Sequence, residues 1–98
     1  MIFINENDAI GSKAFAINVF EAIKPTLQQR VSSMAFKDFE NDIEFFKEID
    51  FTELSGDTFA AVVTAIEKAD IQGIDSDMQT ALVKLMQADP RFKESIPA

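Results

Sequence analysis

Residues 36–49, FKDFENDIEFFKEI, decide the fold class of this chain. Their apolar positions recur three or four residues apart, which is the spacing of one face of an α-helix. That face comprises Phe36, Phe39, Ile43, Phe46 and Ile49. Glutamates follow one another at four-residue intervals on a different face, at Glu40, Glu44 and Glu48. The segment therefore predicts an amphipathic helix with an apolar stripe, mostly aromatic, for the core and a separate row of carboxylates.

Helical spacing also occurs before this segment. Asn7 or Asp8 can cap a first helix that runs to residue 24, where Pro25 is expected to break or kink it. Apolar residues at 27, 31 and 34 then predict a short second helix or a continuation of the first. The three apolar residues at positions 2–4 favour a short strand, which must dock on the core or pair with another chain.

Two more helices are predicted after residue 50. The segment 55–57 offers a start for a helix that ends near residue 70, and residues 70–74 form a turn. Asp75 or Ser76 can cap a last long helix that ends at Asp89 and Pro90, followed by one helical turn in the tail. The sequence thus predicts an all-α fold, a compact bundle of four to five helices with a short N-terminal strand, in a single acidic domain spanning residues 1–98.

The composition excludes much chemistry. The 98 residues include no His, Cys, Trp or Tyr, but 10 Phe. Without imidazole or thiol, the common nucleophile pairs and transition-metal sites cannot be assembled. The acidic turn from Asp70 does not match a calcium-binding EF-hand loop, because Asp75 and Ala81 stand where glycine and glutamate are needed. We therefore expect no enzymatic activity, no catalytic residues, no metal site and no cofactor.

The charge balance limits the partners. Seventeen acids against nine bases give a formal charge of -8, which repels nucleic-acid phosphates and anionic lipid surfaces. No apolar run is long enough to span a membrane, and the N-terminus lacks the pattern of a secretory signal. We expect a cytoplasmic protein that binds neither nucleic acid nor membrane.

The acids are concentrated between residues 38 and 57, a segment that contains eight acids and a single base, Lys47. Clustered carboxylates accelerate encounter with a basic protein, and nearby aromatic side chains supply contact area. The sequence thus predicts a protein-binding module, acting as an inhibitor, adaptor or assembly factor. Its predicted contact residues are Asp38, Glu40, Asp42, Glu44, Phe45, Glu48, Asp50, Phe51 and Glu53.

Other interpretations of the same features remain open. The first predicted helix is apolar on two sides, which favours a structural subunit of a homo-oligomer or larger assembly that associates through Ile10, Ile17 and Phe20. The carboxylates could instead imitate nucleic-acid phosphates or only keep the domain soluble. A small enzyme using a lysine is a further alternative.

Overall fold

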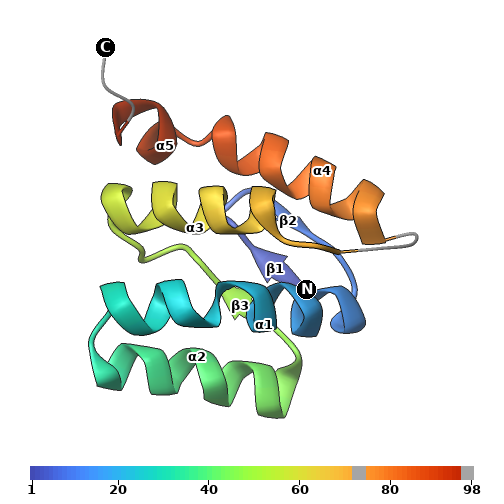
Figure 1. Cartoon of the computed structure of the whole chain (residues 1–98), viewed down its shortest axis with the longest axis vertical. Helices are drawn as coiled ribbons and strands as arrows, with labels where there is room; N and C mark the ends of the chain where they lie inside the picture. Colours follow the sequence, from blue (N-terminus) through green and yellow to red (C-terminus); the bar gives the residue numbers. More distant parts are fainter. Residues whose placement is uncertain (72–74, 96–98) are drawn as a thin grey trace.

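The computed structural model describes residues 1–71 and 75–95, and the predicted turn at 70–74 lies partly outside them (Figure 1). Within these ranges there are five helices and three short strands. In chain order they are β1 (Ile2–Phe3), β2 (Ala9–Ile10), α1 (Lys13–Arg30), α2 (Ser33–Phe46), β3 (Ile49–Asp50), α3 (Gly56–Lys68), α4 (Asp75–Gln87) and α5 (Pro90–Ser95). The chain is mostly helical, as predicted, but the all-α class is wrong because three short strands form a small sheet.

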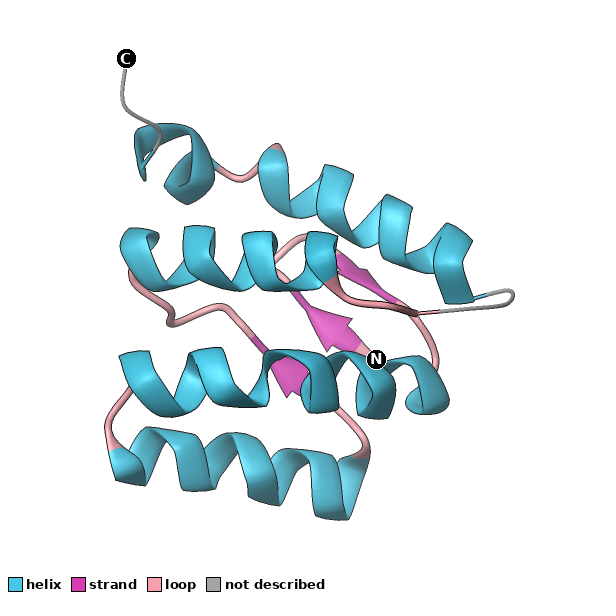
Figure 2. Ribbon diagram, viewed as in Figure 1, coloured by secondary structure: helices cyan, strands magenta, loops and turns pink. Residues whose placement is uncertain are grey.

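The helices lie in adjacent layers. α1 and α3 pack against each other in the middle, α2 covers the far side of α1, and α4 and α5 cover α3 (Figures 1 and 2). None of the described helices is long and apolar enough to cross a membrane.

The sheet has the strand order β2-β1-β3. β1 runs antiparallel to β2, with Ile2 opposite Ile10, and parallel to β3, with Ile2 opposite Ile49. A parallel pair needs a long crossover connection, and α1 and α2 provide it here. The strand predicted at the N-terminus therefore exists and pairs inside its own chain.

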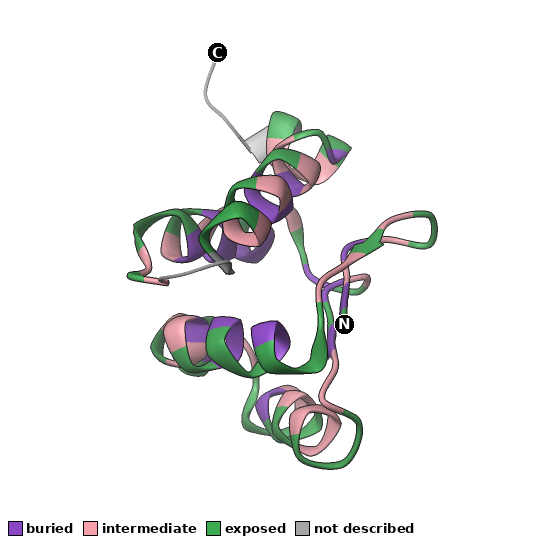
Figure 3. Ribbon diagram, turned by 90° about the vertical axis from the view of Figure 1, so that its right-hand side faces the viewer, coloured by how far each residue is buried: buried purple, intermediate pink, exposed green. Residues whose placement is uncertain are grey.

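The core fills the space between the helices and the sheet. In Figure 3 the buried residues gather on the helix sides that face one another and on the strand segments. Ile2 and Ile4 from the N-terminal segment are fully buried together with Phe15 of α1 and Phe59 of α3. The strands therefore contribute the apolar surface that covers one side of the helices.

α1 begins later than the sequence predicted. Its N-cap is Ser12, whose Oγ accepts a hydrogen bond from the Phe15 amide at 3.2 Å. The side chain of Asn5 instead accepts bonds from the amides of Asn7 and Asp8, which closes a turn between β1 and β2. The predicted start at residue 7 or 8 is wrong because those residues lie in a turn, closed by Asn5, that leads into a strand.

Of the alternatives predicted at Pro25, a break with a separate second helix is wrong, and the continuation of the first helix is confirmed, since α1 runs through Pro25 to Arg30. A proline inside a helix removes one backbone hydrogen bond and costs about 3 kcal/mol. On either side of it, Ile23 and Leu27 are fully buried. Burying two such side chains contributes about 3 to 6 kcal/mol, which is enough to hold the helix together.

The aromatic stripe of α2 is shorter than predicted. Phe36, Phe39 and Ile43 pack on the core, but the helix ends at Lys47, which adopts a left-handed conformation with φ of 56°. The next residues form β3, so Ile49 is buried through the sheet, and Phe46 remains 61% exposed. A change from helical to strand spacing within the stripe explains this difference.

A polar hub formed by Arg91 joins three distant segments. Its guanidinium donates hydrogen bonds to the backbone carbonyls of Ile4, Phe51, Thr52 and Leu54, at 2.6 to 3.3 Å. The same group lies 4.0 Å from the centre of the Phe59 ring. One side chain of α5 thus ties the end of β1 and the β3–α3 loop to α3.

Asp89 completes the hub. Its carboxylate forms an ion pair with Arg91 at 3.0 Å, and its Oδ2 accepts a bond from the Asn5 side chain at 3.1 Å. Asp89 is only 5% exposed. The hydrogen bonds from Arg91, and secondarily the one from Asn5, lower the pKa of Asp89 to about 2.

This pKa predicts a pH dependence of stability. Because the pKa of Asp89 is lower in the folded chain than in the unfolded one, its ionised form stabilises the fold above pH 4. That contribution, about 2 kcal/mol, is expected to disappear as the pH falls from 4 to 2. Urea unfolding of the wild type and of Asp89→Asn checks this prediction. The difference between their free energies of unfolding should shrink by about 2 kcal/mol between pH 6 and pH 2. A difference independent of pH would contradict the assignment.

Candidate functional site

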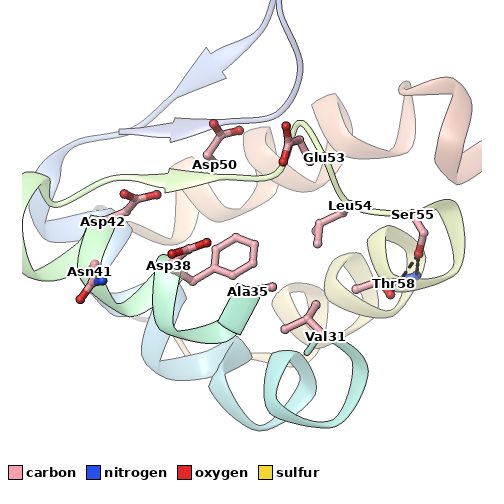
Figure 4. Close-up of a pocket in the computed structure, with 11 residues that line it drawn as sticks. Val31, Ala35, Asp38, Asn41, Asp42, Asp50, Glu53, Leu54, Ser55 and Thr58 are labelled. Carbon is pink, nitrogen blue, oxygen red and sulfur yellow. Dashed lines mark hydrogen bonds between the residues drawn. The ribbon is translucent and has the colours of Figure 1, made fainter. Parts of the chain in front are cut away.

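An acidic groove lies between α2 and the segment that leads from β3 into α3 (Figure 4). Its volume is about 640 Å³. Asp38 and Asp42 line it from α2, and Asp50 and Glu53 line it from the opposite side. Four of the predicted contact residues, drawn from two separate segments, therefore meet at one concave site.

The rest of the lining is largely apolar. Leu54 is buried, and three residues are partly buried: Val31, the C-cap of α1, and Ala35 and Phe39 of α2. In Figure 4, Leu54 and Val31 lie toward one end of the groove, and Asp42 lies toward the other. Ser55 and Thr58 lie at the same end as Leu54, and Glu53 lies next to it, so the apolar side chains of the groove have polar neighbours (Figure 4).

The start of α3 forms the remaining edge. Ser55 caps this helix, because its Oγ accepts a bond from the Thr58 amide at 3.4 Å and donates one to the Thr58 hydroxyl at 3.2 Å. Both residues line the groove, as does Asn41 of α2. The cap predicted at 55–57 is confirmed, and it fixes the edge of the groove next to Leu54.

The carboxylates of the groove repel one another. Partial burial raises the pKa of Asp42, and repulsion from Asp50, Asp38 and Glu48 raises it further. The residues that line the groove, all in the described part of the chain, include no lysine or arginine. Negative charge in the groove is therefore not neutralised by a lining side chain.

Nearby polar groups are engaged locally. Asp50 accepts bonds from the amide and hydroxyl of Thr52, which shapes the turn after β3. The ammonium group of Lys47 donates to the carbonyl oxygen of Glu44 at 2.7 Å, at the end of its own helix. The single base in the acidic segment is thus bonded to a helix carbonyl.

The other predicted acids lie outside the groove. Glu40 and Glu44 are exposed on α2 and do not line it, and Glu48 follows the helix and contributes only through its charge. Phe45 is 69% exposed, so it is available for contact as predicted. Phe46 is exposed as well, although the sequence placed it in the core stripe.

Phe51 is the contact residue that the structure contradicts. Its side chain is fully buried, and its carbonyl accepts a bond from Arg91 at 2.6 Å. It follows β3, where alternation turns its side chain toward the core, away from Asp50. Phe51 holds one wall of the groove in place and cannot touch a partner.

The predicted self-association surface is only partly accessible. Phe20 is 4% exposed and stacks on Phe36 of α2, with ring centres 6.1 Å apart. Ile10 is partly buried against the core, while Ile17 is 36% exposed. Phe20 belongs to the broad apolar face of α1 that packs against α2 and α3, so it is wrong as an association residue. Self-association through Ile17 stays a prediction.

Neutralising Asp42 is expected to stabilise the fold. Asp42→Asn removes a partly buried charge that its neighbours repel, so the free energy of unfolding at pH 7 should rise by about 0.5 kcal/mol. The gain should shrink as the pH falls through the raised pKa of Asp42, because the wild-type carboxyl then becomes protonated as well. Urea unfolding measures both effects, with Glu40→Gln as the control of equal charge change. A less stable Asp42→Asn protein would contradict the prediction.

Among the described residues, no three His, Cys, Asp or Glu side chains are grouped so that they could hold a metal ion. Comparison with known protein families, curated proteins and solved structures gave no match for this chain.

Proposed function

We propose that this chain is a protein-binding module that docks a basic partner protein through the acidic groove, acting as an inhibitor, adaptor or assembly factor. The observation that carries the proposal is the meeting of Asp38, Asp42, Asp50 and Glu53 around one groove without a basic side chain in its lining. A lysine or arginine of a partner placed there would relieve the repulsion that raises the pKa of Asp42.

Two exposed aromatic side chains adjoin these carboxylates. Phe46 follows Asp42 by four residues in the same helix, and Phe45 follows Asn41 by four, so each lies one turn beyond a groove residue. Partly exposed aromatic groups supply much of the contact energy in protein interfaces. The net charge of -8 supplies long-range attraction toward a basic surface.

Affinity capture with two charge-matched variants tests this function. Asp38→Asn with Asp42→Asn removes two of the four carboxylates that line the groove, whereas Glu40→Gln with Glu44→Gln removes the same charge from a part of α2 that does not line it. We expect the wild type and the second variant to capture a basic protein. With the first variant, the amount of that protein captured should fall at least tenfold. Because Asp42→Asn is expected to stabilise the fold, unfolding would not explain the loss.

Circular dichroism confirms that each variant is folded before capture is compared. Equal capture by both variants would overturn the proposal and leave the carboxylates as a solubilising surface.

A further inference from the structure

The groove itself suggests what part of a partner it accepts. Its volume of about 640 Å³ falls within the range of pockets that enclose a small ligand. A folded protein face needs about 800 Å² on each side for a stable interface. The groove has two walls, and its size suits a few side chains and not a folded surface. A folded surface would fit the exposed outer face of α2 instead.

Apolar side chains of the lining lie at some distance from Asp42 along α2. Ala35 and Asp42 are seven residues apart, which corresponds to about 10 Å along a helix. Leu54 lies next to Glu53, with Ser55 and Thr58 beyond it, while Asp50 repels Asp42 toward the other end (Figure 4). A ligand that carries a cation and an apolar group about 10 Å apart would therefore match Asp42 and Leu54 together.

We infer that the acidic groove binds a linear peptide segment of the partner, in which a lysine or arginine and an apolar residue stand about three positions apart. An extended chain advances about 3.3 Å per residue, so three positions cover the length of the groove. The basic side chain lies between Asp42 and Asp50, and the apolar side chain lies on Leu54 and Ala35. This inference rests on the proposed function and specifies the partner's recognition element.

Titration of the ¹⁵N-labelled full chain with defined peptides tests the inference by NMR. The probe is the acetylated, amidated hexapeptide Gly-Arg-Ser-Gly-Leu-Gly. In one control peptide glutamine replaces the arginine, and in the other serine replaces the leucine. We expect the probe to shift the amide signals of both Asp42 and Leu54, and to bind at least tenfold more tightly than either control.

The two charge-matched variants are titrated with the same probe. Asp38→Asn with Asp42→Asn should weaken binding at least tenfold, and Glu40→Gln with Glu44→Gln should leave it within twofold of the wild type. The inference is overturned if the serine control binds as tightly as the probe, or if the shifts spread over Glu40 and Glu44, because the chain then recognises charge alone.

Failure of the inference is distinguishable from failure of the proposed function. One outcome is that no peptide binds at millimolar concentration, although the groove variant still fails to capture the basic protein. Recognition of a linear segment is then disproved. The partner then presents a folded surface, and the proposed function stands. If capture and titration are both unaffected by the groove variant, both proposals fall.

Discussion

Replacing Arg91 with methionine is expected to lower the free energy of unfolding by about 3 kcal/mol. The substitution keeps an unbranched apolar stem but removes the donor for four backbone carbonyls and leaves the Asp89 carboxylate buried without its cation. Removing one partner of a buried ion pair costs about 3 to 5 kcal/mol. Because the Arg91 side chain is 21% exposed, we expect the lower end of this range.

The effect can be measured by thermal and urea unfolding. Circular dichroism at 222 nm is the suitable signal, since the chain has no Trp or Tyr. A loss of this size corresponds to a fall in the melting temperature of roughly 10 to 25 °C for a domain of this length. Lys93→Met is the matched control, because it removes an exposed cation from the same helix and should change stability by less than about 0.5 kcal/mol. An Arg91→Met protein as stable as this control would disprove the role of the hub.

Gly11→Ala is expected to destabilise the fold by about 2 to 4 kcal/mol. Gly11 connects β2 to the cap of α1 with φ of 100°, a conformation that side chains rarely allow. A Cβ added there would lie 2.7 Å from Cδ2 of Phe15, which is fully buried and has no room to move. Backbone strain and a clash in the core each cost about 1 to 3 kcal/mol.

Gly56→Ala is the control for this prediction. Gly56 is the first residue of α3, with helical backbone, so alanine should be neutral there or stabilise the fold by up to about 1 kcal/mol. Both variants are compared by urea unfolding. If Gly11→Ala loses less than 1 kcal/mol, the turn can relax around the new methyl group, and the close approach of Phe15 is not a constraint.

The helices were predictable where one spacing continued over several turns. α3 begins at the predicted Ser55, and its core face matches the sequence pattern because this helix buries a single stripe. The strands could not be predicted in the same way. β2 and β3 have two residues each, which is too short for an alternating pattern to be recognised. Their pairing is determined by Ile2, which lies between them in the sheet.

The site was predictable in its charges but not in its shape. The density of acids near Asp42 was visible in the sequence, and four of those acids do line the groove. The segment after β3 passes alongside one face of α2, and its position determines which acids line the groove. Glu40 and Glu44 do not line it for this reason. Phe51 was misplaced for the same reason, because its burial follows from a strand that no sequence pattern indicated.

The role of Arg91 in the hub was not predicted from the sequence. What could have drawn attention to it is the Asp89-Pro90-Arg91 order, in which an aspartate precedes a proline at the start of a helix and can accept a bond from the second residue after it. That signal predicts a local cap, whereas the bonds to Ile4 and Phe51 depend on contacts between distant segments.

The bond between Arg91 and the carbonyl of Ile4 joins residues 87 positions apart. Contacts between residues so distant in sequence form slowly, because the chain must lose much of its freedom before they contribute any stability. During synthesis, the carbonyl of Ile4 therefore gains this bond only after Arg91 has left the ribosome. We expect versions shortened before α5 to be less stable, because the carbonyls of Ile4 and Phe51 then have no donor from Arg91.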